Sequence, residues 1–128
     1  MSKLKLGQTP KFFKPFNVKF TLPDGESDQI NVTYHYMTRS QFASFLNGLF
    51  AESGDEKPEE VTQVDFEKLF AKGGEKTVAH LTKIIHKWDF EEPPTRETFA
   101  LLHDQVPAAA AALTSVFSDA CTTGKLGN

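Results

Sequence analysis

The prolines between Trp88 and Phe117 constrain the fold more than any other feature of the sequence. Pro93 and Pro94 lie in a short acidic break after Trp88, and Pro107 interrupts the apolar stretch that follows. Because proline fixes φ and has no amide hydrogen, it suits loops and the first turn of a helix. We therefore predict three short helical pieces, the first ending at Trp88, which must fold back on each other or on a neighbour. Their apolar residues are Trp88, Phe99, Leu101, Leu102, Val106, Leu113, Val116 and Phe117.

Two stretches near the N-terminus alternate between apolar and polar residues. Residues 16–22 and 30–36 both have this period of two, which is typical of half-buried strands. Residues 23–26, with a proline, an aspartate and a glycine, form a turn signal between them. The pair predicts an antiparallel β-hairpin with one apolar face that needs a cover. The apolar positions are Phe16, Val18, Phe20 and Leu22, then Ile30, Val32, Tyr34 and Tyr36.

A helix is predicted directly after the hairpin. Thr38 and Gln41 have the spacing of a capping box, in which each side chain bonds the other residue's backbone amide. Apolar residues then recur with the period of an amphipathic helix. We expect this helix to end near residues 53 and 54 and to cover the hairpin. Its apolar residues are Phe42, Phe45, Leu46, Leu49 and Phe50.

Two further helical segments are predicted after an acidic loop at residues 54–60. The first begins near Thr62, and Gly73 and Gly74 are expected to break it. The second covers residues 77–88. Their apolar residues are Phe66, Leu69 and Phe70 in the first segment, and Val78, Leu81, Ile84, Ile85 and Trp88 in the second.

The last two helices begin at clear signals. Thr95 fits an N-cap, and Pro107 fits the first position of the final helix. We therefore predict one mostly helical α+β domain over residues 16–117, with an N-terminal β-hairpin packed on a bundle of four to five short helices. Trp88 is expected to be largely buried beside one of three aromatic residues: Phe42, Phe45 or Phe99.

Both ends of the chain are expected to be flexible. Residues 1–15 form a basic arm without a clear period, and residues 118–128 lose the apolar period of the last helix. Phe12, Phe13 and Phe16 lie near the end of the arm. Two interpretations are open: these aromatic residues pack onto their own domain, or they dock on another subunit.

Composition and residue spacing argue against several classes of function. The net charge of −3 and the pI near 5.8 are unfavourable for binding nucleic acid. No apolar run approaches the ~20 residues of a membrane span, and we see no signal peptide. Cys121 is the single cysteine, and the histidines lack the spacing of metal ligands on one helix: His35, His80, His86 and His103. We expect no enzyme, no metal and no cofactor.

The order of the predicted elements resembles the tail assembly chaperones of long-tailed bacteriophages over roughly residues 16–117. Many relatives have a glycine before the tryptophan, where this chain has Lys87. The matching residues are Thr38-Arg39-Ser40-Gln41-Phe42 at the start of the first helix, Ile84-Ile85-His86-Lys87-Trp88-Asp89 before the acidic linker, Thr95-Arg96-Glu97 with residues 99–102, and the last helix from Pro107 to Phe117.

This resemblance implies a function in assembly. Such chaperones bind the long, largely helical tape measure protein, keep its apolar surface soluble and help recruit tail tube subunits. They act in the host cytoplasm and are absent from the mature virion. A chaperone that coats a rod-like client implies self-association into a ring or spiral. The candidate partner-binding residues are Phe12, Phe13, Phe16, Trp88, Phe90 and Phe117.

The resemblance also raises the possibility of a longer product. In many relatives a ribosomal frameshift near the stop codon adds a domain that contacts tail tube subunits. Gly124 and Lys125 are the expected frameshift position, since one common slippery sequence encodes Gly-Lys. The alternative function is a structural tail-completion or adaptor protein that is retained in the virion. A DNA-binding regulator fits less well, because no predicted helix is basic enough.

Overall fold

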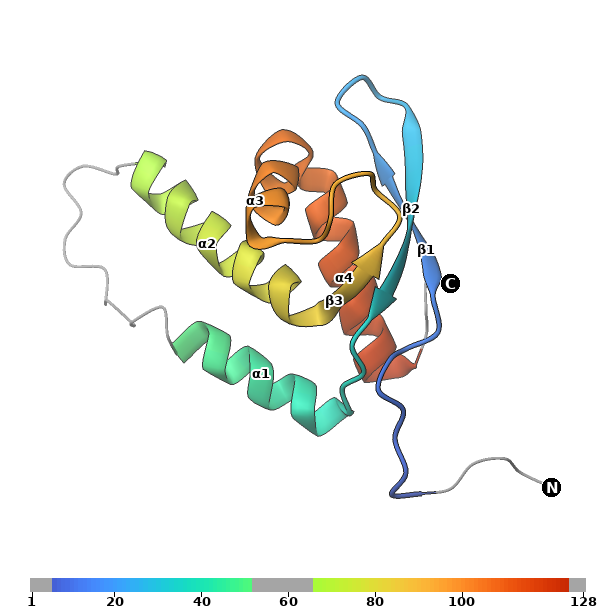
Figure 1. The fold of residues 1–128 in the computed structure, drawn as a ribbon. Coiled ribbons are helices and arrows are strands. Elements are labelled where there is room, and N and C mark those ends of the chain that lie inside the picture. Colours follow the sequence, from blue (N-terminus) through green and yellow to red (C-terminus); the bar gives the residue numbers. More distant parts are fainter. Residues whose placement is uncertain (1–5, 52–65, 125–128) are drawn as a thin grey trace.

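The chain forms a three-stranded antiparallel sheet with four helices on one side of it, within residues 6–51 and 66–124, which the computed structural model describes (Figure 1). The predicted α+β fold with an N-terminal hairpin is confirmed. The strands follow the order β1-β2-β3 across the sheet. The elements are β1 (Phe16–Thr21), β2 (Ser27–Tyr34), α1 (Arg39–Ala51), α2 (Phe66–Ile84), β3 (Ile85–Trp88), α3 (Arg96–Gln105) and α4 (Pro107–Thr123).

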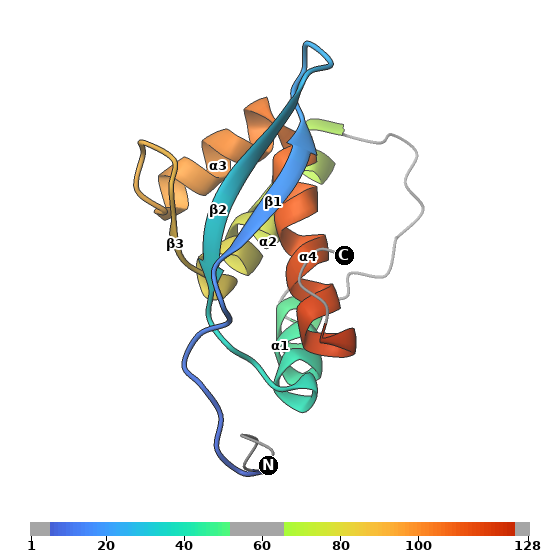
Figure 2. The ribbon, with the colours of Figure 1, turned by 90° about the vertical axis from the view of Figure 1, so that its right-hand side faces the viewer.

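Strands β1 and β2 are the predicted hairpin. Phe16 lies opposite Val32 and Val18 lies opposite Ile30, so the apolar residues of the two strands share one face. Along β1 the side chains alternate between buried or half-buried and exposed, because one face of the sheet packs on the helices (Figure 2). Gly25 in the turn has φ 90°, a conformation that glycine adopts without steric cost.

The end of the N-terminal arm continues the hairpin pairing beyond β1. The Phe13 amide donates to the Tyr34 carbonyl at 3.0 Å, and the Tyr36 amide donates to the Lys11 carbonyl at 2.9 Å. The arm is therefore attached to its own sheet from Lys11 onward. These two hydrogen bonds agree with the first interpretation, in which the aromatic residues of the arm pack onto their own domain.

Helix α1 begins with the predicted capping box. The Gln41 amide donates to Thr38 Oγ1 at 3.1 Å, and the Thr38 amide donates to Gln41 Oε1 at 2.8 Å. The expectation that this helix covers the hairpin is wrong. Helix α4 lies against β1 instead, and α1 packs on α4 and α2. The small buried side chains of Ala109 and Ala110 explain this, since they let α4 approach the sheet closely.

Helix α2 is continuous through Gly73 and Gly74, so the predicted break is wrong. Packing against α3 overrides the low helix propensity of the two glycines. A Cβ atom at Gly74 would lie 3.5 Å from the His103 ring on α3, which is ordinary contact. The acidic loop predicted at residues 54–60, the helix start near Thr62 and the apolar side chains predicted at positions 50, 66, 69 and 70 lie outside the described part of the chain.

Gly73 offers a direct test of this override. A Cβ atom there would meet no atom within 4 Å, and the residue is exposed. We expect Gly73→Ala to raise the free energy of unfolding by about 0.5–1 kcal/mol, because alanine is the better helix former. Gly25→Ala, at positive φ, should lower it. Urea unfolding followed by circular dichroism measures both changes. An unchanged or lower stability of Gly73→Ala would contradict a continuous α2.

The third strand, β3, occupies residues that we assigned to a helix ending at Trp88. Helix α2 ends at Ile84, where its carbonyl accepts the His35 amide at 2.8 Å. Thr33 then lies opposite Lys87, and Val32 lies opposite Trp88. The free edge of β2 therefore satisfies its backbone groups with β3, which explains why these residues do not continue the helix.

The boundaries of α3 and of the start of α4 agree with the sequence signals. Thr95 is the N-cap of α3, with Oγ1 accepting the Thr98 amide, and Pro107 is the first residue of α4. Helix α4 continues to Thr123, beyond the expected start of the flexible tail at residue 118. It does so because Ala120 and Cys121 are buried.

The interior of the domain is centred on Phe117 of α4. This side chain is fully buried and contacts the rings of Tyr34, Phe42 and Phe13, at centroid distances of 5.2, 5.5 and 6.0 Å. Tyr34 Oη donates to the Leu113 carbonyl at 2.7 Å, which satisfies a buried hydroxyl. Phe117 is thus a core residue, and we withdraw it from the partner-binding candidates.

His80 on α2 and His103 on α3 each have a buried ring nitrogen that this packing leaves without a hydrogen-bond partner among the described residues. In His80 this atom is Nε2, and the ring lies edge-on to Phe45 at 5.1 Å. Burial lowers the pKa of His80 below its usual value of 6.5. The folded protein therefore binds fewer protons than the unfolded chain when the pH falls below about 6.5.

We expect acidification from pH 7.5 to 5.5 to lower the free energy of unfolding. Stability from a lowered histidine pKa is present above the unfolded value and is lost as the pH falls through it. His80→Leu should reduce the slope of the free energy of unfolding against pH, and it should make the protein more stable at pH 5.5. Burial, His86 and Lys83 lower the pKa of His35, so a smaller slope should remain. Urea unfolding at both pH values measures the difference. Equal slopes for both proteins would contradict the role of His80.

Candidate partner-binding groove

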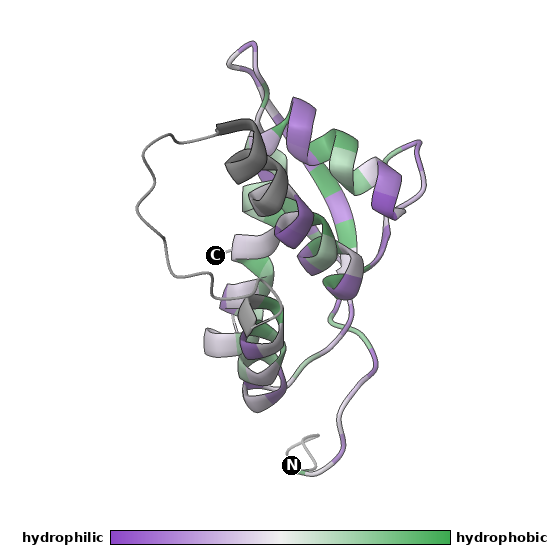
Figure 3. Cartoon of the chain, turned by 90° about the vertical axis from the view of Figure 1, so that its left-hand side faces the viewer, coloured by the Kyte–Doolittle hydropathy of each residue, from purple (hydrophilic) through white to green (hydrophobic). Residues whose placement is uncertain are grey.

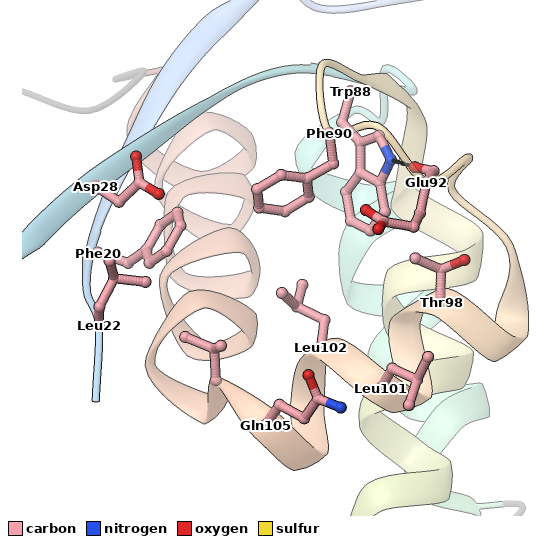
Figure 4. A pocket seen from close by; sticks show the side chains of 11 residues that line it. Phe20, Leu22, Asp28, Trp88, Phe90, Glu92, Thr98, Leu101, Leu102 and Gln105 are labelled. Carbon is pink, nitrogen blue, oxygen red and sulfur yellow. Dashed lines mark hydrogen bonds between the residues drawn. The ribbon is translucent and has the colours of Figure 1, made fainter. Parts of the chain in front are cut away.

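A hollow of about 240 Å³ lies between the hairpin, the loop after β3 and helix α3 (Figure 4). We call it the Trp88 groove, after the tryptophan in its wall. Each of the three walls comes from a different part of the chain, and most of the side chains that face the hollow are apolar.

The loop wall consists of Trp88, Phe90 and Glu92. The Trp88 indole donates to the Glu92 carbonyl at 2.6 Å, which folds the loop back over β3. The loop is also attached to β2, because Asn31 and Asp89 exchange two hydrogen bonds, of 2.9 and 3.1 Å. These bonds fix the start of the loop and the Trp88 ring within the domain itself.

Trp88 connects this wall to the core. Its ring contacts Phe99 and Phe90, each at a centroid distance of 5.0 Å. The predicted neighbour Phe99 is confirmed, and Trp88 packs against the core but keeps part of its surface open. Trp88 is half-buried, since β3 places it at the edge of the sheet and not inside a helical bundle. Its exposed part faces the groove.

The helix wall belongs to α3. Phe99 faces the core and is fully buried, while Thr98, Leu101, Leu102 and Gln105 line the groove. Leu101 is 55% exposed and adjoins the other apolar lining residues, so the groove presents a contiguous apolar surface. Figure 3 shows the apolar middle of α3 between hydrophilic ends.

The hairpin wall consists of Phe20, Leu22 and Asp28. Phe20 and Phe90 approach each other across the groove, with ring centroids 6.4 Å apart. A second hollow of about 410 Å³ continues from the first and shares Leu22, Gln105 and Val106 with it. The apolar depression therefore extends from Trp88 to the start of α4.

The charged groups at the groove have one sign. Asp28 and Glu92 line it and are exposed, and none of the described lining residues is a lysine or an arginine. A partner with positive charge beside an apolar surface would be complementary to this arrangement.

The structure separates the predicted site residues into three groups. Trp88 and Phe90 lie together in the groove, and Phe117 lies in the core. Phe12, Phe13 and Phe16 belong to the arm and the start of β1, at the opposite end of the hairpin from its turn. Phe13 and Phe16 are half-buried, whereas Phe12 is 37% exposed.

Phe12 lies beside a pair of histidines. Its ring stacks on His86 at 4.2 Å, and the His35 ring lies 5.3 Å from that of His86. Among the described residues no three histidine, cysteine or acidic side chains form a group that could hold a metal ion. Burial raises the pKa of Cys121 to about 11, so its thiol is a poor nucleophile at neutral pH.

Sequence reasoning missed most of the groove. Phe20, Leu22 and Leu101 all appear in apolar patterns that predict burial, and nothing in those patterns distinguishes a residue left open to a partner. Helix spacing does contain a weak signal for Leu101, because it lies 200° around the helix from the buried Phe99.

An apolar groove with fixed walls is typical of a surface that binds another molecule. No helix in the described residues has the length and apolar character to cross a membrane. The chain belongs to the phage tail assembly chaperone family, which it matches over residues 1–128. The resemblance seen in the sequence is thereby confirmed, and the family is non-enzymatic. Comparisons with the curated proteins and with the solved structures find no match.

Proposed function

We propose that this chaperone binds apolar segments of the tape measure protein, keeps that protein soluble and helps recruit tail tube subunits. The observation that carries the proposal is the Trp88 groove, an apolar surface held open by internal hydrogen bonds in a member of the tail assembly chaperone family. Contiguous exposed apolar surface is typical of protein-binding sites. The proposed site of action is the host cytoplasm, and the protein is absent from the mature virion.

The proposal includes self-association into a ring or spiral on the client. Phe12 supports this part, because its side chain remains partly exposed although the arm around it pairs with residues 34–36, at the end of β2 and just beyond it. Head-to-tail contacts between identical subunits generate such assemblies.

A longer frameshifted form is also part of the proposal. Gly124 is exposed and follows α4 directly, so an added domain could extend from there toward tail tube subunits. The glycine also has a local explanation, since its φ of 74° is the left-handed conformation that ends many helices. Lys125 lies outside the described residues. The coding DNA tests this part: it must contain a slippery sequence at codons 124 and 125 and an open −1 frame beyond.

Co-expression with the tape measure protein tests the main proposal. We expect the tape measure protein to be insoluble alone and to elute with this chaperone when both are present. An insoluble client in both cases would contradict the proposal. Mass spectrometry of purified virions distinguishes the alternative, a structural tail-completion or adaptor protein, which would be present in the particle.

A further inference from the structure

We infer that the Trp88 groove receives one amphipathic helix that has lysine or arginine residues beside its apolar stripe. The identity of the client rests on the proposed function, whereas the chemistry of the occupant rests on the groove itself. The partner is thus a helix of defined charge, and not any apolar chain.

The spacing on α3 favours a helical occupant. Thr98, Leu101, Leu102 and Gln105 face the groove at positions i, i+3, i+4 and i+7, the pattern of a helix surface that packs against another helix. Helix α3 has ten residues and is about 15 Å long, so roughly three turns of a partner helix can lie along it. The second hollow, which continues past Val106, lengthens the same depression.

The charges on the two opposite walls favour a basic occupant. Asp28 lies on the hairpin and Glu92 lies on the loop, so the apolar floor has a carboxylate on either side. Cationic side chains that flank the apolar stripe of a bound helix would meet both carboxylates. Such charges determine the choice of partner and the association rate more than the total affinity.

The groove is also organised before the partner arrives. The indole bond to the Glu92 carbonyl and the paired bonds between Asn31 and Asp89 fix the loop wall. Fewer side chains therefore need to be ordered on binding, which favours affinity.

Trp88 provides the measurement, because it is the only tryptophan in the chain and lies in the groove wall. The probe is a synthetic 18-residue helix of leucine, alanine and lysine without tryptophan. A second peptide has glutamate at each lysine position. We expect the lysine peptide to change the Trp88 fluorescence in a saturable way, and the glutamate peptide to bind roughly tenfold more weakly. Added salt should reduce this difference.

Glu92→Lys tests whether the charges at the groove cause the selectivity. The substitution leaves the Glu92 carbonyl in place, so the Trp88 hydrogen bond persists. We expect Glu92→Lys to weaken binding of the lysine peptide and to strengthen binding of the glutamate peptide. Asp119→Lys is the matched control, since this exposed residue changes the net charge equally but lies about 18 Å along α4 from Pro107.

Two results would overturn the inference: equal binding of both peptides to the wild-type protein, or equal effects of Glu92→Lys and Asp119→Lys. Neither result depends on the tape measure protein. A chaperone that solubilises its client but does not discriminate between the peptides would retain the proposed function and lose this inference. A protein that discriminates between the peptides but does not capture the tape measure protein would retain this inference and lose the proposed function.

Discussion

The Phe117→Ala substitution is expected to lower the free energy of unfolding by about 3–5 kcal/mol, the range for large-to-small changes of a buried aromatic residue. Phe117 is fully buried, and its ring contacts side chains from the arm, β2 and α1. Truncation would therefore leave a cavity where four parts of the chain meet, and the arm would lose the contact between Phe13 and Phe117.

Urea unfolding followed by far-ultraviolet circular dichroism measures this loss. Leu101→Ala is the control, because Leu101 is large and apolar but 55% exposed, and its truncation should cost much less. A Phe117→Ala protein as stable as the control would mean that Phe117 is not in the core. It would then return to the partner-binding candidates.

The Leu101→Asp substitution is expected to abolish capture of the tape measure protein while the domain remains folded. It places a carboxylate on the apolar helix wall, near the carboxylates of Asp28 and Glu92. A bound apolar side chain would then have to cover an unpaired charge, which is strongly unfavourable. We expect at least a roughly tenfold loss of affinity, which corresponds to about 1.4 kcal/mol.

Ala100→Asp is the matched control for this prediction. Ala100 is an exposed neighbour on the same helix that does not line the groove, so the change has the same effect on charge and a similar effect on helix propensity. The measurements are the amount of soluble tape measure protein after co-expression and the melting temperature of each variant. Full client capture by Leu101→Asp would place the binding surface elsewhere.

Several elements of this protein follow from local sequence alone. The hairpin follows from its period of two and its turn, and the start of α1 follows from the capping box of Thr38 and Gln41. Thr95 and Pro107 begin α3 and α4 where the sequence predicts. In each case the deciding interaction joins residues within a few positions of one another, so the sequence contains all of it.

Contacts between distant segments decided the rest. The apolar residues from Val78 to Trp88 fit a helix as well as a helix followed by a strand, and only the free edge of β2 selects the strand β3. The same holds for Gly73 and Gly74, where packing between α2 and α3 outweighs helix propensity. It also holds for the last turns of α4, which contain the buried Ala120 and Cys121.

The groove also depends on contacts between distant segments of the chain. Phe117 and Leu101 have equivalent places in apolar patterns, yet one lies at the centre of the core and the other faces the groove. The sequence by itself determined that both are apolar residues of amphipathic helices. Which of them is covered depends on whether another segment of the chain packs over it, and this is a property of the tertiary structure alone.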